Sequence, residues 1–260
     1  MHKFERRQKI LSKIKESNFI TTKELFNYTD EIGITNITAR RDLKELELEG
    51  YIKLSFGAVK FIDNSDGKKY ETTREEKLLK NIAEKIAIAK EAVKELTEED
   101  VIFVSPGTTL EYFVKEINKP IKLLATNALE VFRIATQNKN IRNLMMIGGN
   151  FRRRSRSFFG TQAQQQLKDM AFTKGIFSAT NINDELMIYN NNDYEAETII
   201  AALNNCKEKI ALIDSSKFGS VGIAKLALLS DIDCIITDDK ISPEISNKIT
   251  IHKIIATTDA

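Results

Sequence analysis

Cations and apolar residues follow a regular pattern in residues 33–50, GITNITARRDLKELELEG. On a helix, positions spaced by four and three residues form an inward apolar stripe, here Ala39, Leu43 and Leu46. Another face of the same helix carries Ile37, Arg40, Arg41 and Lys44. Guanidinium groups near the start of a helix in the major groove can bond guanine O6 and N7 or phosphates. The pattern therefore indicates contact with DNA.

A second kind of chemistry is predicted after the apolar run VIFV, residues 101–104, where the chain continues as SPGTTLEYF. Gly107 allows backbone amides to approach an anion, and Thr108 and Thr109 supply hydroxyls where a helix begins. The free N–H groups of a helix N-terminus form a phosphate cradle. The loop lacks the GK[ST] of a Walker loop and the third glycine of a dinucleotide fingerprint. The alternative is an ordinary βα turn with a threonine cap.

Further polar residues directly follow other apolar runs. They are Thr126 and Asn127 after IKLLA, Gly148, Gly149 and Arg152 after NLMMI, and Asp214 and Lys217 after KIALI. The carboxyl ends of parallel strands share one edge of a sheet, and ligands collect there in open α/β folds. Hydroxyls, an amide, an arginine and a lysine at one edge predict a pocket for a small polyhydroxy anion. The remaining arginines of RRRSR, residues 152–156, are expected in solvent.

The composition excludes several other kinds of site. Only two histidines occur, His2 and His252, so histidine metal sites and Ser-His or Cys-His catalysis are nearly excluded. Cys206, in a helical pattern, and Cys234 lack metal-ligand spacing and are expected to be buried small hydrophobes. No metal or cofactor is expected. No apolar run approaches the roughly 18 residues of a membrane span, and no secretory signal is present, so a cytoplasmic protein is predicted.

The net charge of +2 is divided unevenly along the chain. Residues 1–60 carry twelve Lys or Arg against nine Asp or Glu, a net of +3, which leaves the other 200 residues at −1. Six of those twelve cations lie between Lys3 and Lys15. The N-terminal segment thus has the electrostatic footprint expected of a protein that binds a polyanion.

Three short helices and a hairpin are predicted to position these cations. The first helix is marked by Phe4, Ile10, Leu11 and Ile14. Thr21 and Glu24 have capping-box spacing at the start of the second, while Thr35 caps the third and Gly50 ends it. Residues 51–61, YIKLSFGAVKF, turn at their glycine and predict a two-stranded wing. This winged helix-turn-helix order favours DNA contact over a merely solvated basic face.

A linker and a larger α/β domain are predicted to follow. The segment DNSDGKKYETTREE, from Asp63, has the charge and turn residues of a linker. A helix is expected from Leu78 to near Leu96, with a buried row of Ile82, Ile86, Ala89 and Val93. Six apolar runs then predict a mainly parallel sheet, at residues 101–104, 121–125, 143–147, 175–179, 209–213 and 234–238. Met145 and Met146 are expected in its core.

The N-terminal motif resembles that of the DeoR family of bacterial repressors. The family's recognition segment typically reads Val-Ser, two variable residues, Thr, a β-branched residue and Arg-Arg-Asp-Leu. The matching positions here are Thr35, Thr38, Arg40, Arg41, Asp42 and Leu43. The family's effector-domain pattern is matched by Gly107–Thr109, Thr126, Asn127, Gly148, Gly149, Arg152 and Asp214–Gly219.

The predicted organisation is a winged helix-turn-helix in residues 1–62, a linker in 63–76 and an effector domain in 77–260. The resemblance implies that this effector domain is a Rossmann-like, mainly parallel α/β fold similar to ribose-5-phosphate isomerase, and that Glu195 also contacts the effector. The residues expected to contact DNA are Thr35, Asn36, Ile37, Thr38, Arg40, Arg41 and Lys44. Those expected to contact the effector are Gly107, Thr108, Thr109, Thr126, Asn127, Gly148, Gly149, Arg152, Glu195 and Lys217.

Two function classes follow from these residues. The first is a repressor, a dimer or tetramer that binds double-stranded operator DNA of a sugar-utilisation or phosphotransferase-system operon and is released by a phosphorylated sugar. The second is a sugar-phosphate isomerase with an accessory DNA-binding domain, which needs a carboxylate base such as Asp214 or Glu195. Ser105 stands where the family commonly has an acidic residue, which removes the most convenient base. The regulator is therefore favoured.

Overall fold

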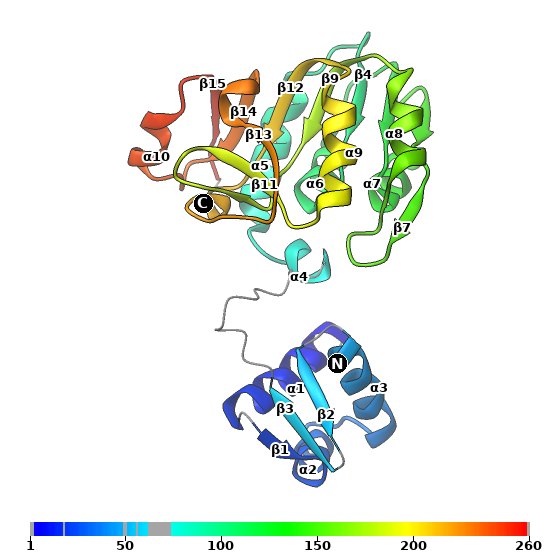
Figure 1. The fold of residues 1–260 in the computed structure, drawn as a ribbon, viewed down its shortest axis with the longest axis vertical. Helices are drawn as coiled ribbons and strands as arrows, with labels where there is room; N and C mark the ends of the chain where they lie inside the picture. The colour runs from blue at the N-terminus through cyan, green and yellow to red at the C-terminus, as the bar shows by residue number, and fades with distance from the viewer. Residues whose placement is uncertain (1–2, 18, 49–50, 56, 62–73, 259–260) are drawn as a thin grey trace. The chain divides into compact units, whose positions relative to one another are not determined.

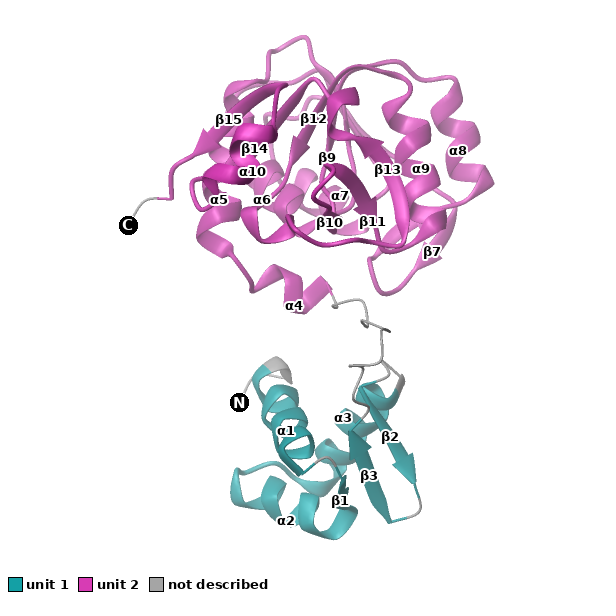
Figure 2. Ribbon diagram, turned by 60° about the vertical axis from the view of Figure 1, so that its left-hand side comes forward, with its two compact units in different colours: residues 1–71 teal, residues 72–260 magenta. Residues whose placement is uncertain are grey.

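The computed structural model describes residues 3–17, 19–48, 51–55, 57–61 and 74–258. The chain divides into two compact units, residues 1–71 and 72–260, which are described separately (Figure 2). Most of the predicted linker lies outside the described residues, but its last part does not follow the prediction, because Arg74–Leu78 form helix α4. Helical structure thus begins within the segment that was expected to be a linker.

The N-terminal unit contains the elements of a winged helix-turn-helix (Figure 1). They are α1 (Lys3–Ser17), β1 (Phe19–Thr21), α2 (Thr22–Glu31), α3 (Asn36–Leu48), β2 (Ile52–Ser55) and β3 (Ala58–Phe61). The predicted capping box is present: the Glu24 N–H donates to the Thr21 hydroxyl at 3.2 Å, and the Thr21 N–H donates to the Glu24 carboxylate at 3.0 Å. The expected helix end at Gly50 and the side chain of Phe4 lie outside the described residues.

The predicted wing is confirmed and has an additional strand. β2 and β3 pair in antiparallel fashion with Leu54 opposite Val59, and Gly57 between them has a φ of +78°, which glycine adopts without steric cost. β1 pairs with β3, so the strand order is β1-β3-β2. The Thr22 N–H donates to the Gly57 carbonyl at 2.9 Å, which ties the turn of the wing to the start of α2.

The core of this unit confirms the inward stripe predicted for α3. Ala39, Leu43 and Leu46 are at most 3% exposed. They belong to one cluster with Ile10 and Ile14 of α1. Burial of these side chains on three helices and the wing fixes α3 on its supports, since apolar burial is the main favourable term in folding.

A seven-stranded sheet forms the centre of the C-terminal unit, and every neighbouring pair in it is parallel, as predicted. Its order is β15-β14-β12-β9-β4-β5-β6. The strands are β4 (Val101–Val104), β5 (Leu123–Thr126), β6 (Leu144–Met146), β9 (Phe172–Phe177), β12 (Cys206–Leu212), β14 (Cys234–Asp238) and β15 (His252–Ala256). The chain runs outward from β4 to β6 and then returns to place β9 beside β4, so the topological switch point lies between β4 and β9.

Helices cover both faces of this sheet (Figure 1). The helices of the unit, besides α4, are α5 (Ile82–Lys94), α6 (Thr108–Glu116), α7 (Leu129–Ala135), α8 (Thr161–Lys168), α9 (Asp193–Leu203) and α10 (Pro243–Lys248). Ile102 and Val104 of β4 pack in the cluster that includes α5, α6 and α7, whereas Phe103 packs in the cluster that includes α8. This alternation is the period of two expected for a strand that is buried on both faces.

Several shorter strands extend the unit beyond the predicted runs. β7 (Asn150–Arg152) and β8 (Ser157–Phe159) form a hairpin. A second small sheet contains β10 (Asn181–Ile182), β11 (Met187–Asn190) and β13 (Ala224–Leu228). Among the described residues, no helix is long and apolar enough to cross a membrane, and no group of His, Cys, Asp or Glu is arranged to hold a metal ion.

Three local predictions were wrong. Ile82 on α5 is 39% exposed, and the buried face of that helix instead includes Lys85, whose ammonium group donates to backbone carbonyls. Met145 is 41% exposed because β6 is an edge strand. Cys206 begins strand β12 rather than lying in a helix and is only partly buried, whereas Cys234 is buried as expected; both are free thiols.

Candidate functional site

The outer face of α3 is largely uncovered. The side chains of Thr35, Asn36, Arg40 and Lys44 are exposed, while Thr38 is partly buried. Ile37 is 84% exposed, and the Arg41 side chain is 79% exposed. The helix therefore presents a face that combines cations, hydroxyls, an amide and one large apolar group.

Local contacts hold the start of this helix. The Thr38 N–H donates to the Thr35 hydroxyl at 3.4 Å, and the two hydroxyls lie 3.0 Å apart, as expected for an N-cap at Thr35. The Arg40 guanidinium lies over the Phe26 ring of α2, 5.2 Å from the ring centroid. The Arg41 guanidinium is 3.7 Å from Glu45 one turn later. Arg40 is thus partly positioned by α2, whereas Arg41 extends into solvent.

One buried ion pair connects α3 to α1, and sequence reasoning missed it. Asp42 is fully buried, and its carboxylate accepts two hydrogen bonds from the Arg6 guanidinium at 2.5 and 2.9 Å. The hydrogen bond to Asp42 raises the pKa of Arg6. Asp42 lies directly between Arg41 and the buried Leu43, so the bidentate pair fixes the rotation of α3 about its axis. Within the basic first helix, at least one cation is therefore structural.

The predicted anion cradle lies at the switch point of the sheet. Gly107 precedes α6, and the Glu111 N–H donates to the Gly107 carbonyl at 3.1 Å as the first turn closes. The N–H groups of the residues before Glu111 have no intrahelical partner, which is a property of every helix start. A Cβ at Gly107 would lie 3.5 Å from the Cβ of Ser178, so the loop after β4 contacts the loop after β9.

Thr126 and Asn127 at the end of β5 have different roles. The Thr126 hydroxyl donates to the Val104 carbonyl at 2.7 Å and accepts from the Ala128 N–H at 3.0 Å, so its bonds serve the fold. The Asn127 amide donates to the Phe158 carbonyl at 2.7 Å. Its Oδ1 is buried and has no hydrogen-bond partner within the described part of the chain. A buried amide oxygen in that state can accept a hydrogen bond from a ligand hydroxyl or from water.

Glu195 and Arg152 meet beside the β7–β8 hairpin. Glu195 of α9 is 4% exposed, accepts from the Ser157 hydroxyl at 2.9 Å and from Ser155, and lies 3.4 Å from the Arg152 guanidinium. Gly149, just before the hairpin, has no room for a side chain, because a Cβ there would lie 2.6 Å from the Phe159 carbonyl oxygen. Nearby, the Gly148 N–H donates to Gln166 at 3.2 Å.

The turn after β12 brings a third set of polar groups. Asp214 is 1% exposed and accepts from the Asn81 amide at 2.9 Å. The Lys217 ammonium lies 4.0 Å from the Asp214 carboxylate, and its side chain is 27% exposed. Lys85 faces the same region, and burial lowers the pKa of Lys85 to about 8. This edge thus carries two lysines and a carboxylate close together.

The turn RRRSR, residues 152–156, departs from the prediction that its arginines other than Arg152 lie in solvent. Arg153 is exposed as expected, but Arg154 is partly buried. Arg156 pairs with Glu130 of α7 at 2.7 Å and with Glu75 of α4 at 3.2 Å. These acidic partners lie on other elements, so spacing along the sequence could not reveal them.

Two family models match this chain. Residues 6–65 match the DeoR-like helix-turn-helix domain, and residues 80–239 match the DeoR C-terminal sensor domain. The chain belongs to the DeoR family. The resemblance predicted from the motifs is confirmed, and this DeoR-family chain is a DNA-binding transcriptional regulator with a sensor domain rather than an enzyme.

Similar DeoR-family proteins extend over nearly the full chain. The lactose phosphotransferase system repressor of Lactococcus lactis subsp. lactis is 37% identical over 94% of each chain. The protein of the same name from Staphylococcus aureus (strain NCTC 8325 / PS 47) is 31% identical over 92% of this chain and 93% of its own.

Solved structures match over about half of each chain. Ribose 5-phosphate isomerase A from Neisseria gonorrhoeae covers 52% of this chain and 53% of that chain, with a TM-score of 0.39 and 15% identity. The eIF2B delta structure from Chaetomium thermophilum covers 54% of this chain and 50% of that chain, with a TM-score of 0.40 and 13% identity.

Proposed function

We propose that this regulator represses a sugar-utilisation or phosphotransferase-system operon and is released from its operator by a phosphorylated sugar. The observation that carries the DNA half is the exposed face of α3, which is held in place by a buried stripe and a buried ion pair. The similar proteins named lactose phosphotransferase system repressors support the choice of operon.

In this proposal α3 reads the major groove of double-stranded operator DNA. Arg40 and Arg41 bond guanine edges or phosphates, and Lys44 neutralises a phosphate. The remaining contacts come from the start of the helix, at Thr35, Asn36, Ile37 and Thr38. Ile37 suits the methyl group of thymine, because it is the large apolar side chain on this face.

The effector is proposed to bind at the carboxyl edge of the seven-stranded sheet. Its phosphate would lie at the N-terminus of α6, against Gly107, Thr108 and Thr109, where backbone N–H groups favour an anion. Lys217 would supply the counter-charge. The sugar hydroxyls would reach the other predicted groups, which are Thr126, Asn127, Gly148, Gly149, Arg152 and Glu195. The Oδ1 of Asn127, which has no hydrogen-bond partner among the described residues, supports a hydroxyl donor at this place.

The organisation of the protein completes the proposal. Residues 1–62 would bind DNA and residues 77–260 would sense the sugar, in the cytoplasm, where operator DNA lies. Operators of two-fold symmetry need paired recognition helices, which supports a homodimer or tetramer.

Two measurements test this function. Selection of bound duplexes from a random-sequence library would identify the operator, and fluorescence anisotropy would give its dissociation constant. Thermal unfolding is then followed with glucose 6-phosphate, galactose 6-phosphate, fructose 6-phosphate and ribose 5-phosphate, with the free sugars and inorganic phosphate as controls. A specific ligand at 100 times its dissociation constant should stabilise the sensor unit by about 2.7 kcal/mol and release the operator. Failure to enrich any duplex would contradict DNA reading, and the absence of any shift would contradict the effector class.

A further inference from the structure

Residues 74–81 form a strap across the edge of the sensor unit where the effector is proposed to bind. The strap comprises α4 and the residues up to Asn81, and it is the first described segment after residues 62–73. α4 packs against α6, the helix whose N-terminus is the predicted anion cradle (Figures 1 and 2). The strap therefore lies in the chain between the DNA-binding unit and the sensor site.

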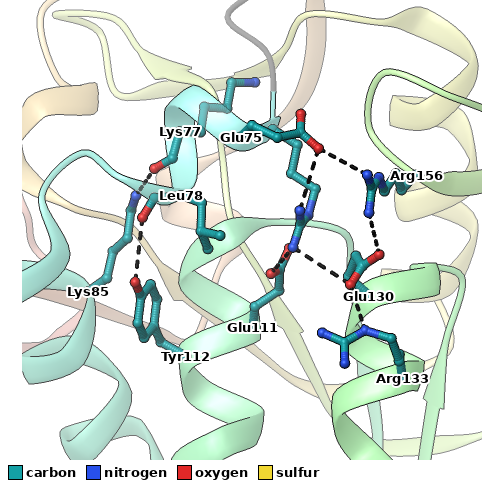
Figure 3. Close-up of polar contacts among 10 residues, drawn as sticks. Glu75, Lys77, Leu78, Lys85, Glu111, Tyr112, Glu130, Arg133 and Arg156 are labelled. Atoms are coloured by element: carbon teal, nitrogen blue, oxygen red, sulfur yellow. Dashed lines mark hydrogen bonds and ion pairs between the residues drawn. The ribbon is translucent and has the colours of Figure 1, made fainter. Parts of the chain in front are cut away.

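Ion pairs hold the first turn of the strap (Figure 3). The Arg74 guanidinium donates to both carboxylate oxygens of Glu111 on α6, at 2.7 and 2.5 Å, and lies 3.8 Å from Glu130. Glu75 pairs with Arg156 at 3.2 Å, and Arg156 pairs in turn with Glu130 at 2.7 Å. The side chains of Arg74 and Glu111 are only 13% and 6% exposed, so this bidentate pair is screened little by solvent.

Hydrogen bonds hold the other end of the strap. Asn81 has a φ of +52°, and its amide donates to Asp214 and to the Ser216 hydroxyl, both at 2.9 Å. The Lys85 ammonium donates to the backbone carbonyls of Lys77 and Lys80, the latter at 2.5 Å, as Figure 3 shows for Lys77. The Lys77 carbonyl belongs to α4 and the Lys80 carbonyl lies just after it, so the ammonium group ties the end of the helix to α5.

Each of the residues that hold the strap in place lies within one turn of a residue proposed to bind the effector. Glu111 follows Thr108 by three residues on α6. Arg156 belongs to the same turn as Arg152, and Asp214 precedes Lys217 by three residues. Charge entering the effector site would therefore act directly on the groups that hold the strap.

We propose that the strap is the element that couples effector binding to the DNA-binding unit, an inference that rests on the function proposed above. A phosphate at the start of α6 places negative charge beside Glu111 and attracts the Arg74 and Arg156 guanidinium groups. Both ion pairs of α4 weaken as a result, and the strap detaches from α6. By linkage, operator binding and effector binding then oppose each other by one shared coupling factor.

The test is the operator dissociation constant with and without each of the four named sugar phosphates, in the wild type, Arg74→Ala and Arg133→Ala. Arg133 is a matched control because it pairs with the same Glu130 at 2.9 Å through a side chain that is 58% exposed, and among the described residues this pair does not involve the strap. In the wild type and Arg133→Ala the effector should weaken operator binding by about 5- to 150-fold. In Arg74→Ala this ratio should fall below about 2-fold, although the sugar phosphate still raises the unfolding temperature.

The possible outcomes are distinguishable. A wild type that responds to none of the four sugar phosphates overturns the proposed function, and the strap's role falls with it. A responsive wild type together with an equally responsive Arg74→Ala overturns the strap alone. If Arg74→Ala does not fold, Asn81→Gly tests the other end, because glycine keeps the left-handed backbone and removes only the amide. Asn81→Gly should lower the same ratio, and an unchanged ratio would overturn the inference.

Discussion

The two candidate binding surfaces are built in different ways. The DNA-facing surface lies on one helix, and its residues fall within ten positions from Thr35 to Lys44. The effector edge gathers loops after β4, β5, β6 and β12, together with Glu195 from α9. A local surface can be predicted from periodicity and altered one side chain at a time. A surface assembled from distant loops depends on the fold that brings them together. Its residues also form hydrogen bonds and ion pairs with one another, as Glu195 does with Ser157 and Arg152.

The largest effect should come from the local surface. Arg40→Ala combined with Arg41→Ala removes two exposed guanidinium groups. Each such group contributes about 1–3 kcal/mol when it forms a bidentate hydrogen bond with a base. Specific operator binding should fall by about 2–6 kcal/mol in fluorescence anisotropy, with an unchanged response of the unfolding temperature to sugar phosphate. Lys139→Ala with Lys168→Ala, which removes two exposed cations from the sensor unit, should leave operator affinity nearly unchanged. Equal losses in the two double variants would show that α3 is not the reading surface.

A second change tests how the local surface is supported. Arg6→Ala leaves the buried Asp42 carboxylate without its bidentate partner, which should destabilise the N-terminal unit by about 3 kcal/mol. Thermal unfolding measures this loss. Lys9→Ala breaks a pair with Glu5 at 3.2 Å in which both side chains are about half exposed, so it should cost less than about 1 kcal/mol. Similar costs for the two variants would argue against a structural role for Arg6.

A third change addresses the assembled surface. Lys217→Ala removes the proposed counter-charge of the phosphate, and a charge-assisted hydrogen bond contributes about 1.5–3 kcal/mol. Sugar-phosphate binding should weaken by that amount in a thermal-shift titration. The variant should bind the operator as tightly as the wild type does, but it should no longer release the operator at the ligand concentration that suffices for the wild type. Lys225→Ala, an exposed lysine on β13, serves as the control. Release of DNA by Lys217→Ala at the wild-type ligand concentration would place the pocket elsewhere.

A pH dependence is also expected at Lys85, whose ammonium group holds the strap. Lys85 has a folded pKa of about 8 against its ordinary 10.5, mainly through burial, with Asp214, Lys217, Glu111 and Glu84 around it. Between these two values the unfolded chain binds a proton that the folded chain does not, so stability rises with pH. The stability of the wild type relative to Lys85→Met should therefore increase from pH 8 to 10 and stay level from pH 6 to 7. A decrease over the upper range would contradict the lowered pKa.

The features that the sequence could predict are those that depend on residues close together in the chain. The α3 stripe, the capping box at Thr21 and the wing at Gly57 depend on neighbours a few residues away, and all three are present. The six strand runs and their parallel pairing were also predicted, because strands buried on both faces are continuously apolar and these runs alternate with helical stretches.

The features that the sequence did not predict depend on distant partners. Arg74 lies in a charged stretch with the composition of a linker, yet Glu111, 37 residues later, holds it in a helix. Lys85 lies on the buried face of α5, which periodicity assigns to apolar residues, because its ammonium group donates to the carbonyls of Lys77 in α4 and Lys80 just after it. β1 and β10 have three and two residues, which is too short to give a periodic signal. The contacts of the effector residues remain predictions.

The position of α4 also bears on how this protein could be recombined with others. Composition would place the boundary of the sensor module after residue 76, in the middle of α4, whereas the compact C-terminal unit begins at residue 72. A chimera that joins a foreign DNA-binding module at residue 73 would inherit Arg74 and its bond to Glu111. One that joins at residue 82 would carry the whole effector edge without that attachment. The choice of splice point would then decide whether an engineered sensor reports its ligand or only binds it.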